Sequence, residues 1–342
     1  MSRQMRGPWK LVCVTPAGRR RYLRLLVPYV LSWPGLDRYD LWVNTPDPAD
    51  IAFMEELASI DSRINLVRLA RNTEPGPQAI GSFWCQAMDT DTVYIRLDDD
   101  VVWIDPHFFE TLLDARVNNE DDFMVAPLTI NNALGTYLLQ TFGKIQVSRR
   151  AGPDRFDPVG WINPSLPLAL HGLLQDLINN GEVERLQCGR VPISANCFSI
   201  NCLSWFGRDI AAFDGVIPVG EDEEAAMSCS IPLRAGRINS IETTAVAAHF
   251  AFYTQRLAMD ASTLLDKYRA IAGSRTELEP WRSQVEAVYE RIEKRFPIHQ
   301  SLGGFKPSVS PRWRRSWIKR LLGVSKPAPV ADVLTVVRGP KF

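Results

Sequence analysis

Apolar extended runs alternate with segments of helical spacing through the first hundred residues. The extended runs are WKLVCVTP, YDLWVN, INLVRLA and TVYIRL, and between them lie GRRRYLRLLVPYVLSW, PADIAFMEELASI and QAIGSFWCQAM. This alternation predicts an α/β layer architecture, because each helix that connects two strands can bury its apolar stripe on the sheet. With 342 residues, of which 46% are hydrophobic, the chain is long enough for one large domain or two moderate ones.

The fourth extended run, TVYIRL, leads directly into Asp98, Asp99 and Asp100. Three carboxylates at the end of a buried strand repel one another and lose hydration, so a compensating cation is expected, with a metal ion as the obvious source. On an extended chain Asp98 and Asp100 point the same way and Asp99 points to the other face. Two carboxylates on one side form a hard oxygen site suited to Mg²⁺ or Mn²⁺. An exposed acidic turn, a helix N-cap and a structural Ca²⁺ site remain alternatives.

The placement of RLDDDV after about a hundred residues of α/β sequence resembles that in the GT-A glycosyltransferases. The similarity is to the family 2-like bacterial type, including the rhamnosyltransferase group, and it extends over roughly residues 9–256. It implies a Rossmann-like mixed sheet, flanked by helices, that binds a nucleotide-sugar. In that fold an Asp-x-Asp motif holds a divalent metal against the donor diphosphate. Asp98 and Asp100 match the motif as metal ligands, and Asp98 and Asp99 as donor-binding residues.

The same resemblance implies a position for the donor nucleotide. The first strand of the family ends near the nucleotide, so Thr15 and Pro16 are expected to line its pocket, together with Asn44 after the second strand.

A second acidic cluster lies in PVGEDEEAAMSC, which carries Glu221, Asp222, Glu223 and Glu224 at the predicted start of a helix. Acidic residues in a first turn stabilise a helix by about 0.3–1 kcal/mol each, which is the structural alternative. In inverting GT-A enzymes a pair of acids in this region includes the general base that deprotonates the acceptor hydroxyl. The resemblance therefore implies that Asp222 is the base, with Glu221 as its rival.

The segment AVAAHFAFYTQR places His249 in an apolar run, where a core histidine is the ordinary interpretation. Many GT-A enzymes use a late histidine as a further metal ligand, so the resemblance implies this role for His249. A neutral imidazole ligand favours Mn²⁺ over Mg²⁺.

The chain changes character after residue 256. Two helical segments predict a C-terminal extension over 257–300, and the remainder, 301–342, reads as a basic amphipathic or flexible tail behind a domain of residues 8–256. From Lys294 to Ala331 there are nine Lys or Arg and no Asp or Glu. In PRWRRSWIKRLLG, apolar residues share one helical face, so this tail predicts contact with an anionic membrane surface. A disordered tail or a docking helix remains the alternative.

These features predict a metal-dependent, inverting hexosyl- or deoxyhexosyltransferase of polysaccharide biosynthesis. Its partners would be a nucleotide-sugar donor and a glycan or lipid-linked acceptor. Lys plus Arg and Asp plus Glu are equal at 39 each, so no nucleic-acid partner is expected. Six cysteines without CxxC spacing, and no signal peptide or long apolar span, predict a cytoplasmic protein, peripheral at the inner face of the membrane through its tail. A non-catalytic sugar-nucleotide or glycan-binding protein and a metal-dependent phosphohydrolase remain the alternative functions.

Overall fold

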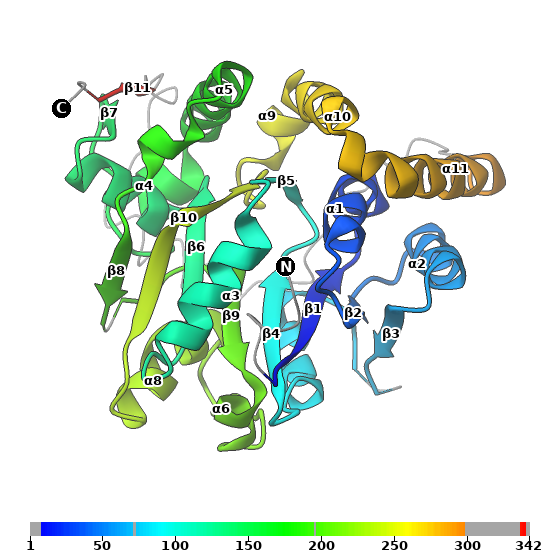
Figure 1. Cartoon of the computed structure of the whole chain (residues 1–342), viewed down its shortest axis with the longest axis horizontal. Coiled ribbons are helices and arrows are strands. Elements are labelled where there is room, and N and C mark those ends of the chain that lie inside the picture. Colours follow the sequence, from blue (N-terminus) through cyan, green and yellow to red (C-terminus); the bar gives the residue numbers. More distant parts are fainter. Residues whose placement is uncertain (1–7, 71–72, 195, 298–335, 340–342) are drawn as a thin grey trace, which may run out of the picture.

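A mixed sheet forms the centre of the computed structural model (Figure 1), which describes residues 8–70, 73–194, 196–297 and 336–339. The strand order is β3-β2-β1-β4-β9-β6-β10-β5, with β8 paired to β10. The strands are β1 (Lys10–Ala17), β2 (Arg38–Val43), β3 (Ile64–Arg68), β4 (Thr92–Leu97), β5 (Val101–Ile104), β6 (Val125–Ile130), β8 (Arg190–Ile193), β9 (Cys202–Phe206) and β10 (Asn239–His249). Strands β1 to β4 are parallel, whereas β9 is antiparallel to β4 and to β6. The predicted α/β mixed sheet flanked by helices is confirmed.

Helices connect these strands and cover the sheet. The α-helices are α1 (Arg20–Ser32), α2 (Pro48–Ile60), α3 (Phe108–Asn118), α4 (Ala133–Thr141), α5 (Ser165–Asn180), α6 (Gly207–Ala211), α7 (Glu223–Ala225), α8 (Ile231–Arg234), α9 (Arg256–Asp260), α10 (Leu264–Ser274) and α11 (Glu279–Arg295). The 3₁₀ helices are η1 (Pro77–Gln86), η3 (Val183–Leu186) and η5 (Thr276–Leu278), and η2 (Pro158–Ile162) and η4 (Ala226–Ser230) are single π turns. Pro28 lies within α1 without ending it.

Both faces of the sheet are buried, as the alternation along β1 shows. Leu11 and Cys13 belong to a core that includes α1, α2 and α3, whereas Val12 and Val14 belong to a second core with η1, α6 and β9. Neighbouring side chains of a strand point to opposite faces, so a strand covered on both sides is apolar throughout. This arrangement leaves the ends of the strands as the accessible part of the sheet.

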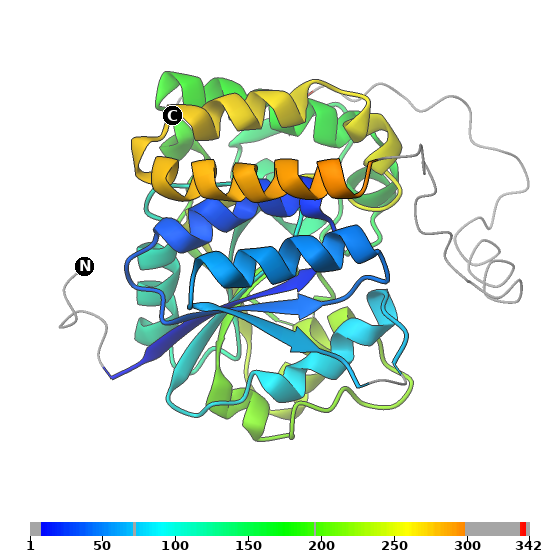
Figure 2. The ribbon, with the colours of Figure 1, turned by 90° about the vertical axis from the view of Figure 1, so that its right-hand side faces the viewer.

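The C-terminal helices extend the helical layer over α1 and α2 (Figure 2). Arg20 of α1 donates to Glu293 of α11 at 2.8 Å, and Tyr289 packs edge-on against Phe53 of α2. The predicted C-terminal helices therefore pack directly on the first half of the chain.

A short strand near the C-terminus returns to the body of the protein. Strand β11 (Val336–Arg338) pairs antiparallel with β7 (Ile145–Val147), and Arg338 forms an ion pair with Glu182 at 2.7 Å. The amphipathic segment predicted within 301–342 lies outside the described residues. Among the helices that are described, none has the length and apolar character needed to cross a membrane.

Candidate metal centre

The three aspartates lie in a tight turn between β4 and β5. The N–H of Asp98 donates to the carbonyl of Asn201 at 2.8 Å, and the N–H of Val101 donates back to the carbonyl of Asp98 at 3.0 Å. The carbonyl of Asp100 accepts from the N–H of Phe250 at 2.8 Å. Backbone hydrogen bonds therefore attach the turn to the start of β9 and to the end of β10.

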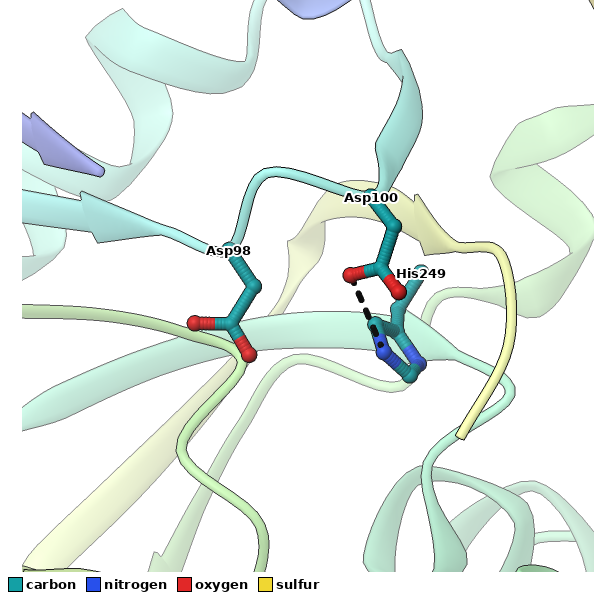
Figure 3. A group of neighbouring side chains, drawn as sticks. All are labelled: Asp98, Asp100 and His249. Atoms are coloured by element: carbon teal, nitrogen blue, oxygen red, sulfur yellow. Dashed lines mark ion pairs between the residues drawn. The ribbon is translucent and has the colours of Figure 1, made fainter. Parts of the chain in front are cut away.

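Two of the aspartates lie close to a histidine at the end of β10 (Figure 3). One ligand atom each from Asp98, Asp100 and His249 lies within 4.8 Å of the others, and Nε2 of His249 is 3.4 Å from Oδ1 of Asp100. Asp99 and Asp100 are turn residues, so the expectation of an extended backbone through the three aspartates was wrong. The turn nevertheless brings Asp98 and Asp100 together, and β10 brings His249 to them.

The orientation of His249 is set by Asn131. Nδ1 of His249 lies 3.3 Å from the carbonyl oxygen of Asn131, which can only accept a hydrogen bond. Nδ1 therefore carries the proton, and Nε2 is left to face Asp100 with a lone pair or a second proton. Asn131 presents this carbonyl from the left-handed region, with φ of 61°, and its side-chain amide donates to Phe250 and Gln255 at 3.0 Å each.

The donor set fits a divalent metal ion. Oδ1 of Asp100 is buried and makes no hydrogen bond with the described residues, and its contact with Nε2 of His249 is long, at 3.4 Å, although burial makes an under-bonded carboxylate oxygen costly. Two carboxylates and one imidazole are ligands that Mn²⁺ accepts readily. The sequence-based choice of Asp98, Asp100 and His249 as ligands is thus compatible with this geometry.

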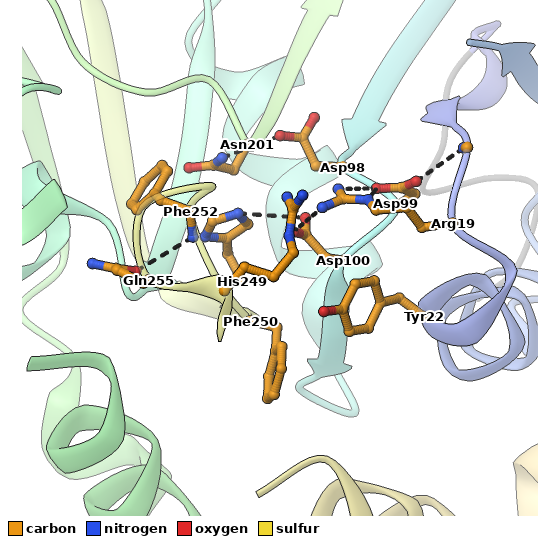
Figure 4. Close-up of polar contacts among 12 residues, drawn as sticks. Arg19, Tyr22, Asp98, Asp99, Asp100, Asn201, His249, Phe250, Phe252 and Gln255 are labelled. Carbon is orange, nitrogen blue, oxygen red and sulfur yellow. Dashed lines mark hydrogen bonds and ion pairs between the residues drawn. The ribbon is translucent and has the colours of Figure 1, made fainter. Parts of the chain in front are cut away.

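Arginines already neutralise part of the acidic turn (Figure 4). Arg19, between β1 and α1, donates to Asp99 and to Oδ2 of Asp100, the latter at 2.8 Å, and Arg96 of β4 donates to Asp98 at 3.0 and 3.1 Å. Burial opposes ionisation of Asp100, but Arg19, His249 and Arg256 together outweigh it, so the pKa of Asp100 lies well below its usual value. The compensating cation expected for the three aspartates is therefore supplied in part by Arg19 and Arg96, and a metal ion at the centre stays a prediction.

Asp99 faces away from the metal cluster. Its Oδ2 accepts from the N–H of Gly18 at 2.9 Å, and its Oδ1 accepts from Nε of Arg19 at 2.8 Å. Burial raises the pKa of Asp99, against the opposing charge of Arg19. Asp99 thus attaches the turn to the start of α1.

In the second acidic cluster, Asp222 and Glu221 each have both carboxylate oxygens engaged by other side chains. Arg155 donates to both carboxylate oxygens of Asp222, which also accepts from the N–H of Ala225 at 2.9 Å as the cap of α7. These hydrogen bonds, led by that from Arg155, lower the pKa of Asp222. Glu221, its sequence-based rival, is bound to Ser230 and Arg234.

Glu223 and Glu224 interact electrostatically with Asp98 of the metal cluster. Glu223 accepts from Trp84 at 2.7 Å and from Arg96, the same arginine that holds Asp98. Burial raises the pKa of Glu224 to about 7, with Glu223 and Asp98 adding to the shift and Arg155 opposing it. A carboxyl group with a pKa near neutrality is the type that general acid–base catalysis requires.

The residues predicted for the nucleotide pocket are only partly accessible. Thr15 is fully buried with its hydroxyl 3.0 Å from that of Tyr39, and Pro16 is buried beside it. Asn44 is partly exposed and exchanges two hydrogen bonds with Gly76, at 2.7 and 3.1 Å. The structure therefore does not bring these residues into one open cleft, and their nucleotide contact stays a prediction.

Several polar residues of the centre were not anticipated from sequence. Arg19 belongs to the basic run AGRRR directly after the first strand, which is a signal at the sheet edge where ligands bind. Asn131, in the left-handed region after β6, carried no comparable pattern.

Sequence comparisons identify no relatives, because no protein-family model matches the chain and no curated protein matches it significantly. The mannosyltransferase PcManGT from Pyrobaculum calidifontis, in complex with GDP-Man and Mn²⁺, is 10% identical with a TM-score of 0.44 over 92% of this chain and 81% of its own. A GalNAc-T enzyme with UDP, GalNAc and Mn²⁺ is 10% identical with a TM-score of 0.43 over 84% of this chain and 54% of its own. CMP:2-keto-3-deoxy-manno-octonic acid synthetase with CTP is 12% identical with a TM-score of 0.40 over 78% of this chain and all of its own, 100%. Similarities at this level identify neither a substrate nor a reaction.

Proposed function

We propose that the chain is a metal-dependent glycosyltransferase of GT-A type, which moves a hexosyl or deoxyhexosyl group from a nucleotide-diphosphate donor to a hydroxyl group. The observation that carries the proposal is the meeting of Asp98, Asp100 and His249 at the ends of β4 and β10. In open α/β sheets the carboxyl ends of the strands are where nucleotide ligands bind. Within the proposal the acceptor is a glycan or a lipid-linked saccharide, as in polysaccharide biosynthesis.

Asp98, Asp100 and His249 would hold Mn²⁺ or Mg²⁺, with Mn²⁺ favoured by the imidazole ligand. The bound ion would stabilise the negative charge that develops on the departing diphosphate. The chain itself positions these ligands: Asn201 donates to Asp98 at 3.1 Å, and Asn131 orients His249. The ligands are therefore held before the substrate arrives, which lowers the cost of organising the site.

The acceptor hydroxyl needs a base to take its proton. Asp222 and Glu221 are the sequence-based candidates, and the structure adds Glu224. Arg155 binds both oxygens of Asp222 and lowers its pKa, so Asp222 is a weak base, whereas Arg155 donates to one oxygen of Glu224 at 3.3 Å and the pKa of Glu224 is still raised to about 7. We therefore place Glu224 ahead of Asp222 and Glu221 as the base. The acceptor oxygen, once the base takes its proton, would form a bond to the anomeric carbon on the face opposite the bond that breaks to the leaving diphosphate, so the anomeric carbon would be inverted.

Membrane attachment through residues 301–342 forms a separate part of the proposal. Each Lys or Arg near an anionic leaflet contributes about 1 kcal/mol, so the tail would hold the enzyme at the inner face of the membrane. Co-sedimentation with anionic liposomes at low salt, lost at high salt, is the expected result. Failure of the intact protein to sediment with them would exclude this part alone.

A donor-hydrolysis panel tests the reaction. UDP-, GDP- and dTDP-sugars are incubated with the protein, with and without Mn²⁺, and both products are identified. Release of free sugar and nucleoside diphosphate from one donor, dependent on the metal, supports the proposal. Binding without turnover in the presence of acceptor fits a binding protein, and release of phosphate fits a phosphohydrolase.

A further inference from the structure

Arg256 lies beside the metal cluster without a hydrogen-bonding partner. It is the first residue of α9, and its Nη2 is 4.0 Å from Oδ2 of Asp100, which is beyond hydrogen-bond distance. Its guanidinium makes no hydrogen bond with the residues that the structure describes, and its Nε is also buried. The side chain is nevertheless 29% exposed, so part of it faces solvent.

Other arginines with a buried, unpaired Nε differ from Arg256. Arg24, Arg269 and Arg282 each donate from a terminal nitrogen to a carboxylate, those of Glu286, Asp266 and Glu279 respectively. Arg116 donates to the carbonyl of Asn119 and is fully buried, so it does not face solvent as Arg256 does. The carboxylate pairs return part of the free energy that desolvation of a cation costs. The contact of Arg256 with Asp100, at 4.0 Å, is longer and recovers less of that free energy.

The nearest carboxylate oxygen is already taken. Oδ2 of Asp100 accepts from Nη1 of Arg19 at 2.8 Å. This contact is shorter than the 4.0 Å contact of the same oxygen with Arg256. Burial lowers the pKa of Arg256, and the charge of Arg19 lowers it further. Arg256 holds only the longer of these two contacts, so its terminal nitrogens can still donate to an additional anion.

The backbone before Arg256 is held rigidly. Gln255 is fully buried; its amide nitrogen donates to Gly160 at 2.8 Å, and its amide oxygen accepts from Asn131 at 3.0 Å and from the N–H of Phe252 at 3.3 Å (Figure 4). The unpaired cation is thus presented from a fixed position, not from a free loop.

We propose that Arg256, which lies beside the cluster of Asp98, Asp100 and His249, binds the diphosphate of the nucleotide donor. This inference rests on the proposed function. A guanidinium has a planar fork of donors that matches two phosphate oxygens, and charge-assisted hydrogen bonds of this kind are about twice as strong as neutral ones. If Arg256 contacts the phosphate that a monophosphate lacks, it would select nucleoside diphosphates over monophosphates.

Calorimetric titration tests this role. UDP, GDP and dTDP, and the corresponding monophosphates, are titrated into the wild type and into Arg256→Ala in the presence of MnCl₂. One lost charge-assisted contact corresponds to about a 10- to 100-fold weaker diphosphate affinity. Affinity for the monophosphate is expected to change by no more than about twofold, on the argument that its single phosphate does not reach Arg256.

Two further variants serve as controls. Arg21→Ala removes the same charge from an exposed arginine that pairs with Asp260 of α9, and it should leave both affinities within about twofold. Arg256→Gln keeps the aliphatic stem and a polar end but not the charge or the fork of donors, and it should lose the diphosphate preference as Arg256→Ala does, which provides a second test if the alanine variant unfolds.

The outcomes separate this inference from the proposed function. If the wild type binds a diphosphate and both Arg256 variants bind it with the same affinity, the role of Arg256 alone is overturned. An equal loss of affinity for the diphosphate and the monophosphate overturns it too. Absence of diphosphate binding to the wild type overturns the role of Arg256 and the proposed function together.

Discussion

Asp100 and His249 meet through both side chain and backbone. Nε2 of His249 lies 3.4 Å from Oδ1 of Asp100, and the N–H of the next residue, Phe250, donates to the carbonyl of Asp100 at 2.8 Å. The pairing of β5 with β10 sets Val101 opposite His249, so the sheet itself fixes the contact. The centre is therefore built into strand pairing and does not depend on a flexible loop.

Asn131 offers a test of how the histidine is oriented. Its backbone carbonyl holds His249 from a φ of 61°, a conformation that glycine adopts freely and alanine adopts at a cost of about 1–2 kcal/mol. Asn131→Gly and Asn131→Ala both lose the side-chain hydrogen bonds, but only the alanine variant strains the backbone. We expect Mn²⁺ affinity to fall by about tenfold or more in Asn131→Ala relative to Asn131→Gly, measured by calorimetry. Equal affinities would show that the carbonyl does not position His249.

Asp100→Ala should destabilise the protein. The sequence alone suggests that removing one of three adjacent anions relieves repulsion, but the structure pairs Asp100 with Arg19 at 2.8 Å. Removing the carboxylate leaves Arg19 with one acidic partner fewer and Arg256 with none, at a cost of about 2–4 kcal/mol in the free energy of unfolding. Urea denaturation of the metal-free protein measures this loss. An unchanged free energy of unfolding would show that the pairing of Asp100 with Arg19 does not stabilise the protein beyond the repulsion among the aspartates.

Much of the fold follows from the sequence, and the reason lies in periodicity. The run PADIAFMEELASI was predicted as a helix and forms α2 (Pro48–Ile60), and TVYIRL forms β4, because apolar spacing is a local property. The contact between Asp100 and His249 could be anticipated only through resemblance to a family. The role of Asn131 could not be predicted, because a single left-handed residue has no local signal. Arg19 lies in a basic run at the end of the first strand, but its contact with Asp99 and Asp100 depends on the strand order.

Turnover should distinguish Glu224 from Asp222 as the base. Glu224→Gln keeps the shape of the side chain but cannot accept the acceptor proton, so kcat should fall by about 100-fold or more with donor affinity retained. Asp222→Asn removes the bidentate partner of Arg155 and should reduce stability, while kcat falls less than about tenfold. Glycosyl-transfer kinetics on the best donor of the panel measure both. A larger loss in Asp222→Asn at equal foldedness would return the base to Asp222.

Glu224 should also make stability depend on pH. Its pKa rises from 4.5 to about 7 on folding, because burial disfavours the charged form. The folded state therefore binds the proton more tightly, and the stability that this contributes is fully present below pH 4.5 and lost as the pH rises through about 7. Glu224→Gln does not titrate, so its stability relative to the wild type should increase by up to about 3 kcal/mol between pH 4 and pH 8. Thermal unfolding across this range would contradict the account if the difference stayed constant.

Manganese binding tests the central claim most directly. The electron paramagnetic resonance signal of free Mn²⁺ is followed as the protein is added, with and without the nucleoside diphosphate that binds best, for the wild type and His249→Ala. Because Nε2 of His249 and the carboxylates of Asp98 and Asp100 converge, the account predicts that the wild type removes the free signal at one equivalent, more tightly with the diphosphate present. His249→Ala should weaken Mn²⁺ binding by on the order of 100-fold, beyond the loss typical of outer-shell changes. A wild type that leaves the free Mn²⁺ signal unchanged under both conditions, or a His249→Ala variant that binds as the wild type does, would contradict the metal centre and the function built on it.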